Sequence, residues 1–240
     1  MRDHLKKYLL MAIVTLFVII VINNVLGDPV GTSVTSNSSS GRSDTPVNRA
    51  DEGGQIVTML LSATQQNYAW KAYVGNISGG LTLDDANEWT IYDWTLSSYT
   101  GEIFASRAGS GIAWGSINCS NASRMATENT ALNMGSTDID NINNTFGETS
   151  HANFVVAGRT MTGCPSEAMY VNDSSQVMGA NALFQEIILH DGTNTVFTSV
   201  LEENLVGYDN SSQFDFQMIV PEDDTGGVTT TYYFYAELDS

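Results

Sequence analysis

The hydrophobic positions of this chain form one long run near the N-terminus and many short runs after residue 55. The long run, YLLMAIVTLFVIIVI at residues 8–22, follows the basic residues Arg2, Lys6 and Lys7. A basic start before an apolar helix is typical of an export signal, with the basic end inside the cell. We therefore expect residues 1–27 to be a signal anchor or a signal peptide.

A signal peptide would be removed, whereas a signal anchor would keep the protein attached to the membrane. Val25 and Gly27 lie where signal peptidase prefers small residues, so the chain could be cut after Gly27. Without a cut, residues 8–27 supply 20 positions, enough to cross a bilayer. We favour the retained anchor, with a cytoplasmic N-terminus and the rest on the extracellular face of the cell membrane. A cut would make the protein secreted.

Residues 28–54, DPVGTSVTSNSSSGRSDTPVNRADEGG, contain almost no apolar side chains. Such a segment cannot bury enough apolar area to offset the entropy lost on ordering. We predict a disordered Ser/Thr-rich tether with an end-to-end distance of about 29 Å.

From residue 55 to residue 240 the pattern changes to short apolar runs of strand length, separated by turn residues. Asp191-Gly192 is a tight-turn dipeptide between two of them, which predicts a hairpin of residues 184–190 and 193–201. The other predicted strands are 56–63, 68–75, 80–83, 89–94, 101–106 and 152–158.

In the last two runs apolar residues recur at every second position, which predicts a closing hairpin, Phe214–Leu238. One face is expected in the core, with Phe214, Phe216, Met218, Val220, Tyr232 and Phe234. The opposite face would carry Asp215, Gln217 and Glu237.

One segment has a helical pattern instead. Residues 122–134, ASRMATENTALNM, predict a helix that ends at Gly135. Thr137 with Asp140 then predicts a capping box before a second short helix. That helix would place Ile139, Ile142 and Phe146 on one face and end at Gly147.

These elements predict a mainly β fold. We expect residues 55–240 to form an extracellular antiparallel β-sandwich with a helical insert at about 120–147, preceded by an N-terminal membrane helix. The alternative is two smaller β units that meet near residues 147–152.

The charge of the chain is strongly acidic, with 9 Lys and Arg against 27 Asp and Glu and a net charge of −18. Such a surface repels phosphate backbones, which excludes nucleic acid as a partner. Charged residues make up only 15% of the chain, and the many Ser, Thr, Asn and Gly residues suit a solvated extracellular surface.

The chain has two cysteines, Cys119 and Cys164. Outside the cell such a pair forms a disulfide, here closing a loop of about 45 residues worth about 4 kcal/mol. A zinc site would need clustered ligands, and no histidine lies near either cysteine in the sequence. We therefore expect a disulfide that joins the helical insert to the sheet.

Seven Asn-x-Ser/Thr triplets are candidate glycosylation sites, and export would expose them to the modifying enzymes. They begin at Asn37, Asn76, Asn118, Asn121, Asn143, Asn172 and Asn210. Asn118 and Asn121 are too close together for both to carry a glycan comfortably beside a disulfide.

No convergent catalytic set emerges from the sequence. Ser150 and His151 are neighbours and would point to opposite faces of a strand, and His190 is expected to be an exposed hairpin residue. Acidic pairs such as Asp138 and Asp140 begin like a calcium loop but depart from its pattern, so we interpret them as solvated turns. We expect no enzyme activity, no cofactor and no metal.

Three stretches carry a resemblance: YAWKAYVGNISGGLTLDDAN, GSINCS and FDFQMIVPEDDTGGVTTTYYFYAEL. With the anchor and tether, they make the chain similar to uncharacterised exported, membrane-anchored β-domain surface proteins of archaea. The resemblance implies a surface location and supplies no active site. The layout is also similar to that of archaeal pilins, but Lys6-Lys7-Tyr8 lacks the Gly or Ala expected before a pilin cleavage position.

We expect a membrane-tethered or secreted acidic surface glycoprotein with a structural, envelope-associated or adhesive role. Its expected partners are the membrane, through the N-terminal helix, and envelope or surface proteins, further copies of itself, or glycans. The alternatives are a subunit of an extracellular pilus-like filament and a polysaccharide-binding or polysaccharide-cleaving protein.

Overall fold

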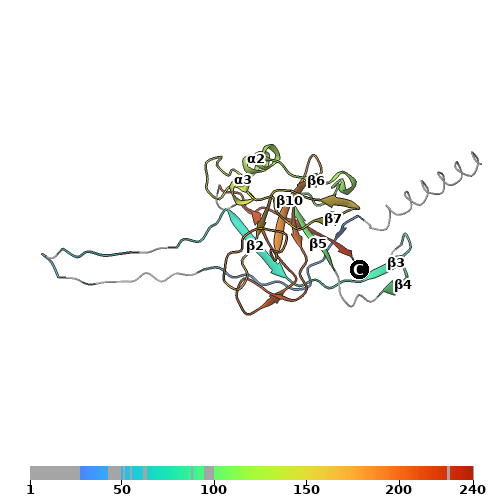
Figure 1. Cartoon of the computed structure of the whole chain (residues 1–240), viewed down its shortest axis with the longest axis horizontal. Coiled ribbons are helices and arrows are strands. Elements are labelled where there is room, and N and C mark those ends of the chain that lie inside the picture. The colour runs from blue at the N-terminus through green and yellow to red at the C-terminus, as the bar shows by residue number, and fades with distance from the viewer. Residues whose placement is uncertain are drawn as a thin grey trace, which may run out of the picture.

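The computed structural model of the chain describes residues 28–42, 50, 52–54, 56–61, 64–87, 89–94, 100–225 and 228–239 (Figure 1). The predicted export segment, residues 1–27, lies outside this part. Within the described ranges, no helix is both long and apolar enough to cross a membrane.

The largest sheet of the described chain is antiparallel throughout. Its order is β1 (Val30–Gly31), β15 (Tyr233–Asp239), β5 (Thr100–Ser106), β11 (Thr195–Val200), β10 (Gln185–His190) and β6 (Asn118–Cys119), with β9 (Ser166–Ala168) also paired to β10. β10 and β11 form the hairpin predicted around Asp191-Gly192, in the register His190 to Thr195. The fold is therefore mainly β, as the sequence indicated.

Smaller elements complete the fold. The two-stranded sheets are β2 (Trp70–Gly75) with β14 (Phe216–Pro221), β3 (Leu81–Asp84) with β4 (Thr90–Trp94), β7 (Phe154–Val156) with β8 (Arg159–Met161), and β12 (Leu205–Val206) with β13 (Gln213–Phe214). The helical elements are the 3-10 turn Trp114–Ser116, α2 (Ala122–Ala131) and α3 (Ile142–Thr145).

The large sheet is covered on both faces. On one face, Ile103, Ile188 and Phe197 pack in a cluster with side chains of β14, α2 and α3. On the other face, Phe104 and Leu189 pack in a second cluster with the β7–β8 hairpin and the 3-10 turn. Strands buried on both faces have continuous apolar runs. This stacking of antiparallel layers is consistent with the sandwich-like class expected from the sequence.

The helical insert is present, but its ends differ from the prediction. Asn121 caps α2 by accepting hydrogen bonds from Ser123 N and Arg124 N. The left-handed residue that follows the helix is Asn133, at φ 56°, and not Gly135. Asparagine tolerates this conformation because its short polar side chain can hydrogen-bond locally.

The predicted capping box of Thr137 and Asp140 is wrong. The cap of α3 is Asn141, whose side chain accepts a hydrogen bond from Asn144 N. Phe146 is 2% exposed whereas Ile139 is 92% exposed. The short helix therefore begins too late to bring Ile139 onto its buried face.

Two strand predictions need correction. Residues 56–61 form no strand, and the expected tether begins with β1, which pairs with β15. The predicted closing hairpin is also wrong: β14 pairs with β2, and β15 lies between β1 and β5. The segment that joins β14 to β15 is too long to impose a tight turn, so each strand pairs with a distant partner.

The polar face expected for the last two strands is buried as well. Asp215 and Gln217 are each 2% exposed and Glu237 is 5% exposed. Gln217 Nε2 donates to Tyr170 O at 3.0 Å, and Tyr208 N donates to Gln217 Oε1 at 2.8 Å. These side chains bind the main chain of covering loops, which satisfies their polar groups inside the protein.

Two buried side chains of the large sheet hold the free edge of β14. Glu186 on β10 and Ser199 on β11 are direct cross-strand partners. Ser199 Oγ donates to Gln217 O at 3.0 Å, and Ile219 N donates to Glu186 Oε2 at 2.8 Å. The pair thus takes the place of a neighbouring strand for two main-chain groups of β14.

Burial raises the pKa of the Glu186 carboxyl well above its usual value, although the hydrogen bond from Ile219 N opposes the shift. The folded protein therefore favours protonated Glu186. A folded pKa above the unfolded value gives a contribution to stability that is complete below about pH 4 and lost as the pH rises through the folded pKa.

We expect the melting temperature of the wild type to fall as the pH is raised from 5 to 9, and Glu186→Gln to remove part of this fall. The amide keeps an oxygen for Ile219 N and carries no charge. Thermal denaturation across this pH range measures the effect, with the exposed Glu203→Gln as a control. Equal pH dependence in wild type and Glu186→Gln would contradict a neutral Glu186.

Candidate functional site

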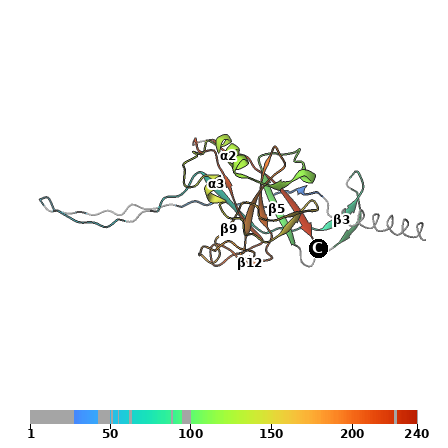
Figure 2. The ribbon, with the colours of Figure 1, turned by 45° about the horizontal axis from the view of Figure 1, so that its top comes forward.

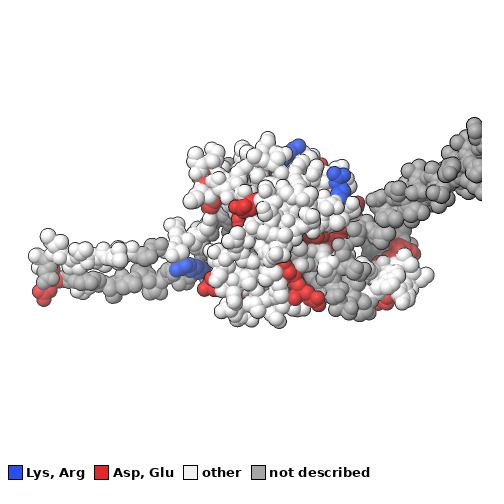
Figure 3. All heavy atoms as spheres, viewed as in Figure 1, with Lys and Arg blue, Asp and Glu red and all other residues white. Residues whose placement is uncertain are grey.

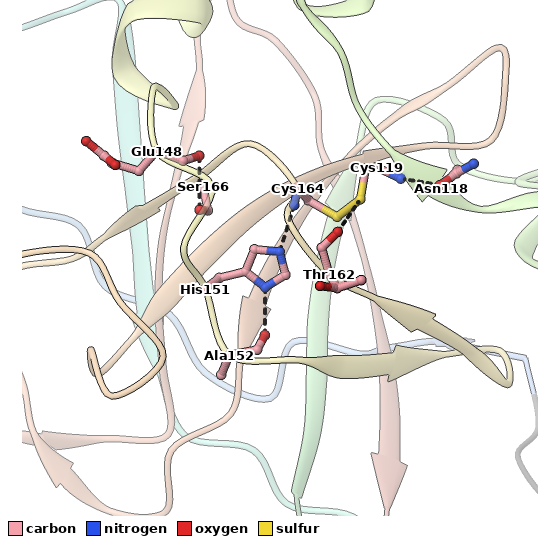
Figure 4. The surroundings of a disulfide bond; sticks show 8 residues. All are labelled: Asn118, Cys119, Glu148, His151, Ala152, Thr162, Cys164 and Ser166. Atoms are coloured by element: carbon pink, nitrogen blue, oxygen red, sulfur yellow. Dashed lines mark hydrogen bonds between the residues drawn. A yellow bond between two sulfur atoms is a disulfide. The ribbon is translucent and has the colours of Figure 1, made fainter.

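The disulfide between Cys119 and Cys164 is confirmed, with Cα atoms 4.8 Å apart. Cys119 lies in β6 immediately before α2, and Cys164 lies between β8 and β9 with no exposed surface. Cys119 also pairs with Leu189 of β10. The bond therefore joins the start of the helical insert to the layer over the second face of the sheet (Figure 4).

His151 lies beside the disulfide, and both of its ring nitrogens bind main-chain groups (Figure 4). Cys164 N donates to Nε2 at 2.8 Å, so Nε2 carries no proton. Nδ1 lies 2.6 Å from Ala152 O, an acceptor, so Nδ1 carries the proton. The ring is 6% exposed, whereas Ser150 is exposed. This arrangement holds two chain segments together and leaves no nitrogen to activate a serine.

The second histidine, His190, is half-buried and not exposed as predicted. Its Nδ1 accepts a hydrogen bond from Gly192 N at 2.9 Å. Burial and the nearby Arg124 lower the pKa of His190. At Asp191, burial acts to raise the pKa, but hydrogen bonds led by Asn194 N and Ala113 N outweigh it and hold the value at about 2. These groups fix the β10–β11 turn.

The structure also brings two carboxylates together, which the sequence alone did not select. Glu102 on β5 and Glu237 on β15 are direct cross-strand partners, and are 3% and 5% exposed. Ala157 N donates to both Glu237 oxygens, at 3.1 and 2.9 Å. A glycosidase needs its carboxylates beside an accessible sugar. This pair is instead buried, and Glu237 anchors the turn between β7 and β8.

The exposed acidic residues hold turns, as interpreted from the sequence. Asp85 accepts hydrogen bonds from Asn87 N and Trp89 N, and Asp223 accepts one from Thr225 N. Acidic side chains lie at several separate places on the face shown in Figure 3. They form dispersed turn contacts there and no single patch.

The two carboxylates of the calcium-like stretch, Asp138 and Asp140, bind different parts of the chain. Asp138 Oδ2 accepts a hydrogen bond from Gly135 N, whereas Asp140 Oδ2 accepts one from Asn67 Nδ2. In the described part of the chain, no group of three or more His, Cys, Asp or Glu side chains is arranged to hold a metal ion.

An open depression lies where β2 and β13 end. It is lined by Thr35, Ser36, Gly75, Asn76, Ile77, Ser78 and Phe214. These residues bring hydroxyl, amide and apolar groups and no ionisable side chain. The depression therefore has no residue for acid–base chemistry, but it does contain one candidate glycosylation site, Asn76.

The structure distinguishes among the seven candidate glycosylation sites. Asn143 is half-buried, and its side chain binds at both ends: Oδ1 accepts from Asn129 Nδ2 at 2.9 Å, and Nδ2 donates to Ala122 O at 3.2 Å. The folded protein thus holds the nitrogen that a glycan would need. The six exposed acceptors are Asn37, Asn76, Asn118, Asn121, Asn172 and Asn210.

Two of the exposed acceptors occupy turn conformations that favour asparagine. Asn172 and Asn210 have φ angles of 59° and 60°, in the left-handed region. Asn118 and Asn121 are exposed on either side of the disulfide-bonded Cys119, and Asn121 also caps α2. These asparagines therefore have local structural reasons to be present besides any modification.

Glu102 and Glu186 were not predicted to be buried, and Glu237 was expected on a polar face, but all three lie in the interior. Each stands within an apolar run, in GEIFAS, FQEIILH and FYAEL. A single acidic residue in a run that is otherwise apolar was the available signal, because a doubly covered strand buries both of its faces. None of the three is assigned a catalytic role by its contacts.

Comparisons with known proteins identify no relative: no family model, no curated protein and no solved structure matches this chain.

We expect the double change Cys119→Ser with Cys164→Ser to lower the free energy of unfolding by about 2–4 kcal/mol, because the cross-link no longer restricts the unfolded chain. Chemical denaturation of both proteins measures the loss. Intact-mass analysis of the wild type, with and without reduction before thiol alkylation, is the control. Two thiols that react without reduction would contradict the bond.

Proposed function

We propose that this chain is an acidic surface glycoprotein, tethered to the membrane or secreted, with a structural, envelope-associated or adhesive role and no catalytic activity. Residues 55–240, together with β1 (Val30–Gly31), would form its extracellular β-sandwich domain, carried beyond the export segment. The resemblance to uncharacterised exported surface proteins of archaea agrees with this proposal.

The observation that carries the proposal is the disulfide with exposed glycosylation acceptors around it. Disulfides persist in oxidising compartments and are rare in the cytosol. Asn118 and Asn121 lie exposed on either side of Cys119. Such acceptors are modified only in chains that pass through the export route.

The contacts of the ionisable residues support a non-catalytic role. His151 binds main-chain groups through both ring nitrogens, and Glu237 anchors a turn. The open depression beside β2 contains no acid or base. His151 and Glu237 thus serve to hold the main chain in place.

Protein purified from the organism that encodes it tests the proposal by glycopeptide mass spectrometry. We expect glycans on several exposed acceptors, on Asn118 or Asn121 but not both, and none on Asn143, whose Nδ2 is bound to Ala122 O. Protease added to intact cells should also remove the domain. A protected and unmodified chain would contradict a surface location.

A second candidate, a filament subunit, is favoured by an unused strand edge. Among the described residues, β2 pairs with β14 alone. Ile219 of β14 donates its N–H to Glu186 and so does not bond to β2. In an antiparallel ladder the residue opposite, Ala72 of β2, then has its N–H and C=O directed away from β14. An open edge of this kind can pair with a strand from another chain.

The same chain contains an unpaired apolar segment. Residues 56–61, IVTMLL, form no strand, and Ile56 and Leu60 are fully exposed. The described residues between 32 and 68 extend from the body on the side opposite the C-terminus (Figures 1 and 2). Such a segment has the composition of a strand that adds to the edge of a neighbour.

We expect Ala72→Pro to abolish any filaments formed by the purified protein, because proline removes an outward N–H from the edge of β2. Electron microscopy of both proteins measures assembly. Ala72→Thr, which keeps this N–H, is the control. Filaments that persist in Ala72→Pro would exclude this edge as the contact, and a wild type that forms none would contradict the filament candidate.

A further inference from the structure

The β3–β4 hairpin leaves the body of the protein without covering either core. It projects on the side where the C-terminus lies, in both views of the ribbon (Figures 1 and 2). Every residue of both strands is exposed. A two-stranded hairpin is marginally stable in water on its own, so this one presents side chains that a partner would have to cover.

The two faces of the hairpin differ in chemistry. Leu81 is opposite Trp94 and Leu83 is opposite Tyr92, so these four side chains share one face. Leu81 is 37% exposed, Trp94 48%, Leu83 53% and Tyr92 58%. The rings of Tyr92 and Trp94 meet edge to face, with centroids 4.9 Å apart. We call these four residues the aromatic face.

The other face has a different composition. Thr82 is opposite Asp93, and both alternate with members of the aromatic face. Ile91 shares this second face and is 79% exposed. The hairpin is therefore an amphipathic ribbon, with a carboxylate directed away from the aromatic face.

The hairpin leaves the body at the end of the sheet where the chain enters it. Val30 of β1 pairs with Ala236 of β15. Gly79 packs closely against Leu238, two residues further along β15: a Cβ added at Gly79 would lie 2.6 Å from the Leu238 side chain. Gly79 stands just before β3. The entry strand and the root of the hairpin thus meet the same end of β15.

This position limits the distance from the apolar N-terminal run to the hairpin. Residues 8–27, the span expected to cross a bilayer, end three residues before Val30. Three extended residues span at most about 11 Å. A bilayer crossed by residues 8–27 would therefore lie close to the end of β15 at which the entry strand and the root of the hairpin meet.

We propose that the aromatic face rests in the interfacial layer of the bilayer that the N-terminal run crosses. This inference rests on the proposed membrane attachment. Tryptophan and tyrosine favour the membrane–water interface, where an apolar ring and a polar group are both accommodated. With Leu81 and Leu83 against the lipid, Asp93 stays on the aqueous face.

A second copy of the chain fits this face less well than lipid. The chain has a net charge of −18, and Asp84, Asp85 and Asp93 lie in or beside the hairpin. Two copies joined at this face would bring two bodies of net charge −18 close to each other, which opposes their association. A zwitterionic lipid surface has no net charge and avoids this repulsion.

Full-length protein in phosphatidylcholine vesicles tests the proposal, with bromine on the acyl chains as a quencher of tryptophan emission. We expect brominated lipid to quench part of the wild-type emission and Trp94→Phe to lose most of that quenchable part. Trp89→Phe is the matched control, since Trp89 is 74% exposed in the same hairpin but outside the aromatic face. It should keep the quenchable part.

A water-soluble quencher, acrylamide, separates the other outcomes. We expect it to have little access to Trp94. Quenching of Trp94 by acrylamide and not by brominated lipid would overturn the proposal, because the face would then be in water. Shielding of Trp94 from both quenchers would overturn it in favour of a protein partner.

Flotation of the vesicles separates this inference from the proposed attachment. Protein that floats with the vesicles while Trp94 escapes brominated lipid contradicts the inference alone. Protein that fails to float contradicts the membrane attachment, and the inference with it.

Discussion

The placement of β14 on the large sheet depends on the buried pair of Glu186 and Ser199. A strand packed across a sheet loses water from its main-chain groups, and each unpaired group would cost about 1–3 kcal/mol. Ser199 donates to Gln217 O and Glu186 accepts from Ile219 N, so two of these groups are satisfied. Met218 lies between Gln217 and Ile219, and Val220 follows Ile219. Both side chains can then enter the core.

The same principle explains the other polar residues in the interior. Glu237 binds the turn at Ala157, and Gln217 binds loops at Tyr170 and Tyr208. His151 joins Ala152 to Cys164 beside the disulfide. Long connections cover both faces of this sheet, and buried side chains supply the hydrogen bonds that those irregular segments cannot make among themselves. Residues of catalytic type are therefore used to build the fold.

Local signals in the sequence predicted local structure well. Asp191-Gly192 marked the hairpin of β10 and β11, although its loop is the four residues 191–194 and not the dipeptide alone. The asparagine-rich insert indicated two short helices. Pairing between distant strands was not predictable, because alternation shows which residues share a face and not which strand lies alongside. The prediction of a terminal hairpin failed for this reason. Of the site residues, the disulfide followed from the cysteine count, whereas the buried glutamates required knowledge that the sheet is covered twice.

The pairing of β1 with β15 has a mechanical consequence for a chain held at its N-terminus. Tension on residue 28 acts first on the two residues of β1, which pair with β15 alone among the described residues. Once β1 is pulled away, the 38 residues between Gly31 and Trp70 can extend to a length of about 125 Å before the load reaches β2. The segment would extend under a sudden pull and so protect the disulfide-bonded body from unfolding.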